Sequence, residues 1–439
     1  MIETAKKILN EAMKRGADQA EVFFTTTKTF GFSSVKDKVK KGYYHQDSGF
    51  GLRVVIGKRV GFSYGRNDVD RIVERALKTC KKSKPLEAEF SLPSRTKKGR
   101  GVFDESVESL DEKTSMEMVK RTVKSVKDVG SKVIEASFSY AVEERGIVNS
   151  EGLENVEKAS YFEIGVEARY RSSSFSDFEY SRKFDLNPEK VGENAGKYAK
   201  DVERARMLKE DVKKVLFHPN VLSGLLTFTV WPSFYADNVQ KHRSLFEGKL
   251  GKQVLARNIT VIDDGTQKDG WRTYGFDGEG CKMKKKFLAR KGVISSFLYD
   301  VYTASKDGVD PTGNGMRSEF RSLPRISLTN VMLKNGKKSW EDFLEDRTVY
   351  VVSTLGSFLS NPATADFSVK IALAYYLENG KLLPVKGNML SGNMLVILKR
   401  LEEVSKETLV AGSPSDVYTY GVPGQKLPYM ATEHVKVSF

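Results

Sequence analysis

The apolar positions at the start of the chain recur with the spacing of an amphipathic helix. The stripe consists of Ala5, Ile8, Leu9, Ala12 and Met13, and Gly16 is suited to a left-handed helix end. A strand is predicted from Ala20 to Thr25. Residues 49–65 alternate on either side of Gly57, so they predict a β-hairpin that turns at that glycine.

A second helix is predicted directly after this hairpin. Asn67 or Asp68 is placed to cap it, and the side chains expected to be buried are Val69, Ile72, Val73, Ala76, Leu77 and Cys80. Ser109 and Glu112 have the spacing of a capping box for a further helix.

Strand patterns follow, and then one long helix. Residues 133–140 alternate as a strand, and residues 149–152 have the composition of a hairpin tip between two more strands. Asn187-Pro188 opens a charged helix that is predicted to run to Ala205. We place the domain boundary at the end of this helix.

Beyond residue 212 the pattern changes to many short strands separated by Gly, Asn and Asp turns. The sequence therefore predicts an α+β protein with two domains. Residues 1–207 should form a domain in which helices cover a mixed sheet, and residues 212–439 should form a β-rich domain.

Charge and cysteine content narrow the classes of function. The net charge is +15, from 72 Lys and Arg against 57 Asp and Glu, but acidic residues are interspersed with the basic ones along the chain. Dispersed charge without a nucleic-acid-binding motif predicts a solvated surface and no specific nucleic-acid partner. Two cysteines far apart indicate a reducing compartment, and no apolar run is long enough for a signal peptide or a membrane span. We expect a cytoplasmic protein with no membrane partner.

Several short segments, spread over nearly the whole chain, together resemble the TldD/PmbA family, whose members are sometimes described as modulators of DNA gyrase. They are residues 16–22, 49–65, 149–152, 244–251, 263–265, 276–280, 312–315 and 364–368. The later groups 378–380, 384–385 and 392–393 are similar to PmbA-type chains in particular. This resemblance implies a barrel-like C-terminal domain and a dimer enclosing a chamber in which extended peptides are cleaved.

Active members of this family carry His-Glu-x-x-x-His after a Leu-Leu pair, together with a C-terminal cysteine. The Leu pair is present at 225–226, and this register places Thr227 at the first histidine, Phe228 at the glutamate and Pro232 at the second histidine. Tyr420 falls at the position of the cysteine. None of these side chains supplies a zinc ligand or the general base that such a site requires.

The resemblance therefore implies a PmbA/TldE-like, non-catalytic subunit of a metalloprotease complex that matures or degrades peptides. Zinc is expected in a TldD-like partner that retains His-Glu-x-x-x-His, and none in this chain. The partner is that paralogue or a second copy of this chain, and the substrate is an unfolded or extended peptide. Thr227, Phe228, Trp231, Pro232 and Tyr420 are expected to line the vacated site, where they either contact peptide or fill the space of the metal.

Two rival functions remain open. The first is an active metallopeptidase with other ligands, although His45, His218, His242 and His434 show no close pairing and Asp263-Asp264 suits a turn. The second is a regulatory protein associated with DNA gyrase. A serine hydrolase is disfavoured, because the G-x-S-x-G match at residues 61–65 lies within a predicted hairpin strand and has no sharp elbow at Ser63.

Overall fold

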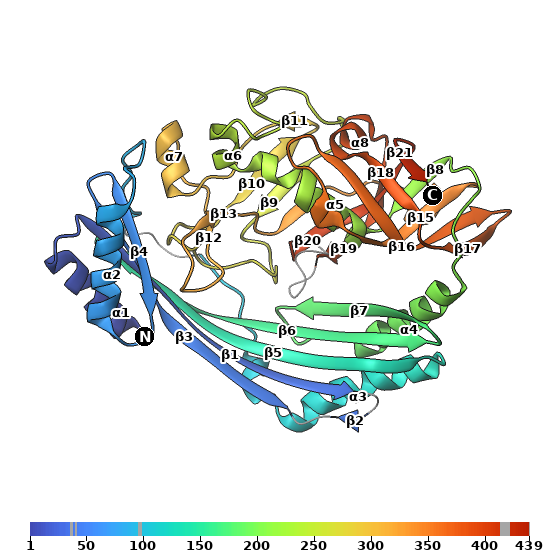
Figure 1. Ribbon diagram of the computed structural model, residues 1–439, viewed down its shortest axis with the longest axis horizontal. Coiled ribbons are helices and arrows are strands. Elements are labelled where there is room, and N and C mark those ends of the chain that lie inside the picture. Colours follow the sequence, from blue (N-terminus) through green and yellow to red (C-terminus); the bar gives the residue numbers. More distant parts are fainter. Residues whose placement is uncertain (36–37, 40–41, 95–98, 413–421, 439) are drawn as a thin grey trace.

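The first half of the chain is built on one long antiparallel sheet, here called the N-terminal sheet (Figure 1). The computed structural model describes residues 1–35, 38–39, 42–94, 99–412 and 422–438. The strand order is β4-β3-β1-β5-β6-β7, with β2 beside β1. The strands are β1 Gln19–Val35, β2 Lys38–Val39, β3 Tyr43–Ile56, β4 Arg59–Gly65, β5 Lys132–Asn149, β6 Glu154–Tyr170 and β7 Ser173–Ser181.

The prediction of a mixed sheet in this half is wrong, because every strand pair described in the N-terminal sheet is antiparallel. Tight hairpins join β3 to β4, β5 to β6 and β6 to β7, and a hairpin can only connect antiparallel strands. Long strands with short turns therefore replace the crossover connections that parallel pairs would need.

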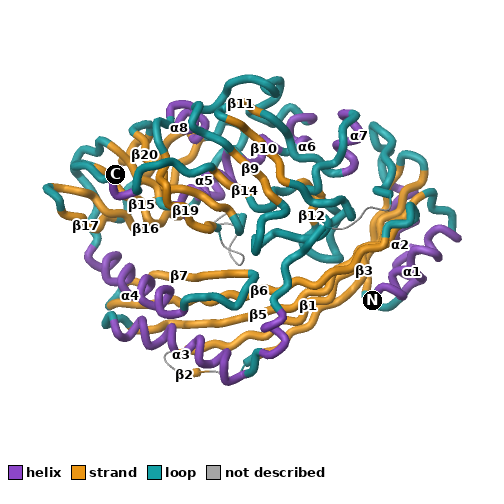
Figure 2. Tube along the Cα trace, turned by 180° about the vertical axis from the view of Figure 1, so that it is seen from behind, coloured by secondary structure: helices purple, strands orange, loops and turns teal. Residues whose placement is uncertain are grey.

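Helices cover one face of this sheet (Figure 2). Ala20, Val22 and Phe24 of β1 pack with the first two helices, while Phe32, on the same face, packs with the later pair. The helices are α1 Ile2–Lys14, α2 Val69–Lys82, the 3-10 turn η1 Glu105–Ser109, α3 Glu112–Asp128 and α4 Pro188–Arg204. The opposite face bears Phe23, which packs against Phe276 of the second half.

Most of the local predictions in this half are confirmed. Gly16 follows α1 with φ +93°, Asp68 caps α2, and Cys80 is buried. The predicted capping box is wrong: Ser109 ends η1, and the side chain of Asp111 caps α3 by accepting from the backbone N–H of Thr114.

The second half forms a sheet of twelve strands, the C-terminal sheet, in the order β11-β10-β9-β14-β20-β8-β15-β16-β18-β21. β17 pairs with β16 and β19 with β20. The strands are β8 Lys214–Phe217, β9 Val261–Asp264, β10 Lys285–Arg290, β11 Val293–Ile294, β14 Val331–Leu333, β15 Thr348–Leu355, β16 Asp366–Glu378, β17 Lys381–Val385, β18 Met389–Asn393, β19 Val404–Ala411, β20 Gln425–Thr432 and β21 Val435–Ser438. This is the mixed sheet of the protein, because β8 is parallel to β15 and β14 is parallel to β20.

Short helices and one small β-ladder complete this half. They are α5 Pro219–Thr229, η2 Trp231–Phe234, α6 Ala236–Gln240, α7 Val301–Asp307, η3 Trp340–Phe343, η4 Ser357–Leu359 and α8 Met394–Arg400, with β12 Gly315–Met316 paired to β13 Arg325–Ile326. The α+β class is confirmed, and within the described residues the strand order is an open path. None of the described helices is both long and apolar enough to span a membrane.

A buried ionic network joins the two halves. Arg53 of β3 donates to Glu21 of β1 at 2.9 Å and to Glu279 of the second half at 3.0 Å. Arg317 of the second half also donates to Glu21. All four side chains are at most 6% exposed, so these charges are satisfied by one another rather than by water.

Candidate functional site

The position that the sequence predicts to be a vacated metal site lies at the end of α5. The helix begins at Pro219, carries the buried pair Leu225 and Leu226, and ends at Thr229. The chain continues as the 3-10 turn η2, in which Pro232 lies near the start. Proline cannot donate a backbone hydrogen bond to a preceding α-turn, so its position fits the helix end predicted there.

Gln425, at the start of β20, is the centre of the polar contacts at this helix end. Its side chain is fully buried. The amide oxygen accepts from the indole Nε1 of Trp231 at 2.7 Å, and the amide nitrogen donates to the hydroxyls of Ser223 at 2.7 Å and Thr227 at 3.0 Å. The same nitrogen also donates to the carbonyl of Val422 at 2.9 Å. One amide thus ties the last two turns of α5 and Trp231 to the β20 segment.

These contacts decide what the predicted site residues are able to do. The Thr227 hydroxyl accepts from Gln425 and also from the backbone N–H of Val422 at 3.2 Å. Trp231 is 1% exposed and its ring nitrogen is only a donor, while Pro232 has no side-chain donor atom. A zinc ion requires thiolate, imidazole or carboxylate ligands, so this donor set does not fit one.

The structure brings Thr227 and Trp231 together through Gln425, whereas Phe228 and Pro232 are half-buried beside them. Tyr420 lies outside the described residues. Peptide contact by this set stays a prediction. Gln425 and Ser223 were missed, because no sequence period marks a polar residue that will be buried against a distant helix.

Two of the four histidines, and both adjacent aspartates, make structural contacts. His218 precedes α5, and its Nδ1 accepts from the backbone N–H of Asn220 at 3.2 Å. Burial lowers the pKa of His218 to about 4, which keeps the ring neutral. His242 pairs with Glu247 at 2.6 Å. Within the described ranges, no group of three or more His, Cys, Asp or Glu side chains is arranged to hold a metal ion.

Asp263 and Asp264 have separate structural roles. Asp263 accepts from the side-chain amide of Asn314 at 2.9 Å and pairs with Lys286 at 3.0 Å. Asp264 accepts from the backbone N–H of Thr266 at 2.9 Å, which is the turn formation that the sequence favours. Ser63 lies inside β4, opposite Leu52, so the strand runs through the G-x-S-x-G match.

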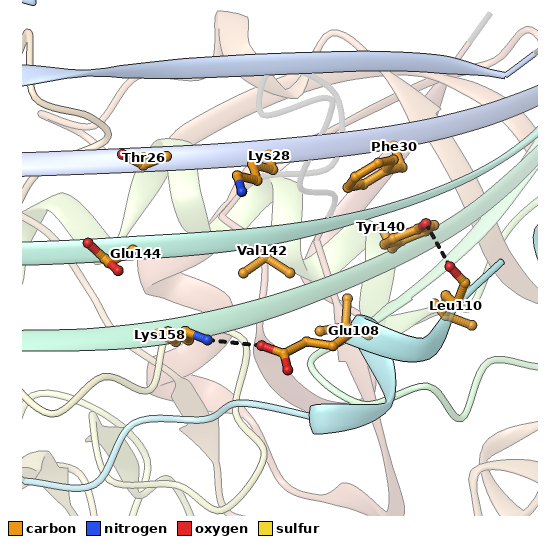
Figure 3. Close-up of a pocket in the computed structure, with 10 residues that line it drawn as sticks. Thr26, Lys28, Phe30, Glu108, Leu110, Tyr140, Val142, Glu144 and Lys158 are labelled. Carbon is orange, nitrogen blue, oxygen red and sulfur yellow. Dashed lines mark hydrogen bonds and ion pairs between the residues drawn. The ribbon is translucent and has the colours of Figure 1, made fainter. Parts of the chain in front are cut away.

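A separate cavity of about 450 Å³ lies on the helix-bearing face of the N-terminal sheet, beside η1 (Figure 3). Phe30 and Tyr140 stack there with their ring centroids 4.9 Å apart, and the Tyr140 hydroxyl donates to the carbonyl of Leu110 at 3.3 Å. Lys158 pairs with Glu108 at 2.9 Å across the cavity. This cavity is distinct from the α5 site.

Three models of one protein family match the chain in succession. The PmbA/TldA metallopeptidase domain 1 matches residues 20–80, the central domain 105–203, and the C-terminal domain 210–438. An uncharacterized protein of Methanocaldococcus jannaschii is 34% identical over 352 residues, which are 80% of this chain and 83% of that protein. A metalloprotease TldD homolog of Buchnera aphidicola is 25% identical over 425 residues, covering 91% and 87% of the two chains.

Two solved structures share the fold over almost the whole chain. TldE of Thermococcus kodakarensis aligns with a TM-score of 0.87 at 24% identity, covering 99% of this chain and 100% of that one. A Thermotoga maritima protein named as a candidate modulator of a DNA gyrase aligns with a TM-score of 0.83, also at 24% identity and 99% coverage of both chains.

Proposed function

Because the chain belongs to the PmbA/TldA metallopeptidase family, the TldD/PmbA family of the sequence resemblance, we propose that it is the non-catalytic subunit of a two-chain peptidase. In this proposal the zinc ion and the peptide-cleaving chemistry belong to a paralogue that retains His-Glu-x-x-x-His. This chain completes the chamber in which an unfolded or extended peptide is held, and both chains work in the cytoplasm.

The observation that carries the proposal is the set of donors at the end of α5. Thr227, Trp231 and Gln425 satisfy one another there, and Pro232 offers nothing to a metal. A metallopeptidase must present a metal-bound water and a base to the scissile carbonyl, and this helix end has neither ligand nor base.

The experiment compares this chain, its His-Glu-x-x-x-His paralogue, and a mixture of the two, each freed of other peptidases. Cleavage of an unfolded peptide should be strong only for the mixture and should stop when a chelator is added. The control mixture contains a paralogue whose two site histidines are replaced, and it should be inactive. Chelator-sensitive cleavage by this chain alone would mean that it is an active metallopeptidase with other ligands.

Size analysis of the mixture distinguishes the two partner arrangements. A complex of one copy of each chain is expected. A stable dimer of this chain that does not bind the paralogue, with no gain in cleavage on mixing, would contradict the proposed partner.

A further inference from the structure

The helices leave the middle of the N-terminal sheet open on their own face. Phe24 of β1 packs with α1 and α2, and Phe32, further along the strand, packs with α3 and α4. Thr26, Lys28 and Phe30 lie between them on the same face, because side chains alternate along a strand. These three residues belong to the cavity of about 450 Å³ beside η1, a volume within the range of small-ligand pockets (Figure 3).

Strand register arranges the floor of this cavity in three successive rows across β1 and β5. The paired residues are Thr26 with Glu144, Lys28 with Val142, and Phe30 with Tyr140. The charged side chains thus lie in the first two rows and the aromatic rings in the third. The cavity therefore has a charged end and an aromatic end.

The charged end offers one cation and one carboxylate. Lys158 lies opposite Glu144 on β6, but it pairs with Glu108 of η1 at 2.9 Å. Among the described side chains, neither Lys28 nor Glu144 has an oppositely charged group within ion-pair distance. They are diagonal neighbours across the strand pair, and such neighbours lie about 7–8 Å apart. This end is complementary to a ligand that carries both charges close together.

The aromatic end offers a flat apolar surface. The rings of Phe30 and Tyr140 are stacked, with centroids 4.9 Å apart and planes 12° apart. The Tyr140 hydroxyl donates to the carbonyl of Leu110, which holds this ring in place. Val107 and Leu110 line the side of the cavity towards η1. An apolar group, and an aromatic ring in particular, gains contact area on such a surface.

We propose that this cavity binds a free α-amino acid with a large apolar side chain. The carboxylate of the ligand lies beside Lys28, its ammonium group beside Glu144, and its side chain on Phe30 and Tyr140. An α-amino acid fits because both of its charges are attached to one carbon and its apolar group extends from the same carbon. A simple anion such as phosphate would bring a like charge towards Glu144.

This inference goes beyond the proposed function, because it assigns a second site. The cavity lies on the helix-bearing face of the sheet, whereas Phe23 on the other face packs against Phe276 of the second half. Free amino acids are end products of peptide degradation, so the proposed function would supply this ligand. Only that link rests on the proposed function, and the site itself rests on the cavity.

Calorimetric titration of the full chain with L-phenylalanine tests the proposal. One molecule should bind per chain, and L-alanine should bind at least about ten-fold more weakly because it buries less apolar surface and has no ring to stack. Equal binding of the two amino acids would overturn the aromatic end of the site. Absence of phenylalanine binding at millimolar concentration would overturn the proposal.

Two analogues test the orientation of the ligand. Phenylalanine amide lacks the carboxylate and N-acetylphenylalanine lacks the ammonium group, so each should bind about ten-fold more weakly than phenylalanine. Lys28→Gln should weaken phenylalanine binding about ten-fold and leave binding of the amide unchanged. Glu144→Gln should do the same for phenylalanine and leave binding of the N-acetyl compound unchanged. Equal losses for all three ligands would contradict the assigned contacts.

Matched variants locate the site. Lys132→Gln and Glu135→Gln change exposed side chains of the same charges on β5 that do not line the cavity. Both proteins should bind phenylalanine as the parent does. Losses equal to those of Lys28→Gln and Glu144→Gln would show that general charge, and not this cavity, governs binding, and would overturn the assignment.

The titrations use this chain alone, so they are independent of cleavage by the two-chain mixture. Phenylalanine binding together with an inactive mixture would support the cavity and contradict the proposed function. An active mixture together with no phenylalanine binding would contradict the cavity and support the proposed function.

Discussion

At Gln425 a single buried amide holds the end of α5 against the start of β20. It contacts Ser223, Thr227 and Trp231, and it makes four hydrogen bonds of 2.7 to 3.0 Å. Interior side chains are packed as closely as organic crystals, and the buried indole of Trp231 and amide of Gln425 fill the space at this helix end.

Zinc content tests the predicted loss of the metal site. The chain as isolated should hold no stoichiometric zinc by elemental analysis, because Thr227 and Pro232 occupy two ligand positions. The combined change Thr227→His, Phe228→Glu, Pro232→His and Tyr420→Cys should create weak zinc affinity, and each single change should create none. The matched control keeps Thr227 and carries the other three changes. One equivalent of zinc on the unmodified chain, lost when His218 or His242 is replaced, would overturn this prediction.

Asp177 gives the stability of the protein a defined pH dependence. Burial raises its pKa from the ordinary 3.8 to about 6, so the folded state holds this proton more tightly than the unfolded chain does. This group therefore leaves the free energy of unfolding unchanged below about pH 4. It lowers that free energy as the pH rises from about 4 to 6, and the loss is constant above that range.

Asp177→Asn should remove this pH-dependent loss of stability. Because its side-chain oxygen still accepts from Asn194, the variant should be about 1–3 kcal/mol more stable than the parent at pH 8, and equally stable at pH 4. Urea unfolding across this pH range measures the difference. A constant difference at all pH values would show that the carboxyl does not titrate between these limits.

Among the elements, α4 packs on β6 and β7 (Figure 1). Asn187 both caps its first turn and links it to β7. The Asn187 side chain accepts from the backbone N–H of Lys190 at 3.0 Å, and the Asn187 backbone N–H donates to Glu179 at 2.7 Å.

Removing the cap should loosen this helix end. Asn187→Ala should lower the free energy of unfolding by about 1 kcal/mol, because the N–H of Lys190 loses its acceptor. Asn187→Ser restores a capping oxygen and should recover most of the loss. Chemical denaturation of the three proteins measures both effects, and equal stability of the Ala and Ser variants would exclude a capping role.

For the molecule as a whole, the contact between the two halves of the chain includes a buried ionic network. Glu21 faces two arginines, Arg53 and Arg317, and burial lowers the pKa of Arg317 to about 10. The boundary at residues 207–212 stays a prediction, while the network shows that the two halves are joined by more than the chain between them.

Neutralising Glu21 should destabilise the whole protein. Glu21→Gln leaves Arg53 and Arg317 with Glu279 as the carboxylate of the network, and breaking such a buried group costs about 3–5 kcal/mol. Glu74→Gln, on the exposed face of α2, is the control and should change stability by less than about 0.5 kcal/mol. Thermal or urea unfolding compares them, and equal small losses would mean that water screens the network.

The net charge of +15 predicts weak DNA binding that has no sequence preference. Each neutralised phosphate contributes about −0.9 to the slope of log affinity against log salt, and dispersed lysines place few of them on one stretch of backbone. Titration of labelled duplexes at several salt concentrations should give a shallow slope. Tight binding of one sequence at physiological salt would revive the gyrase-associated function.

Local structure followed directly from the sequence. The helical spacing of Ala5, Ile8 and Ala12, the turn at Gly57 and the cap at Asn187 each predicted the element that the structure contains. Backbone geometry imposes a period of 3.6 residues on helices and 2 on strands, so these signals lie within a few neighbouring residues. The register to the family also predicted the helix end that the structure has between Thr229 and Pro232, while the loss of metal ligands there stays a prediction.

Only the tertiary structure determined which residues far apart in the sequence contact one another. Gln425 reaches Thr227 across 198 positions, and Arg317 reaches Glu21 across 296. The antiparallel order of the strands described in the N-terminal sheet is likewise absent from any local period. Such contacts depend on the order and register of strands, and these are selected by the burial of the whole chain rather than by the preference of any one segment.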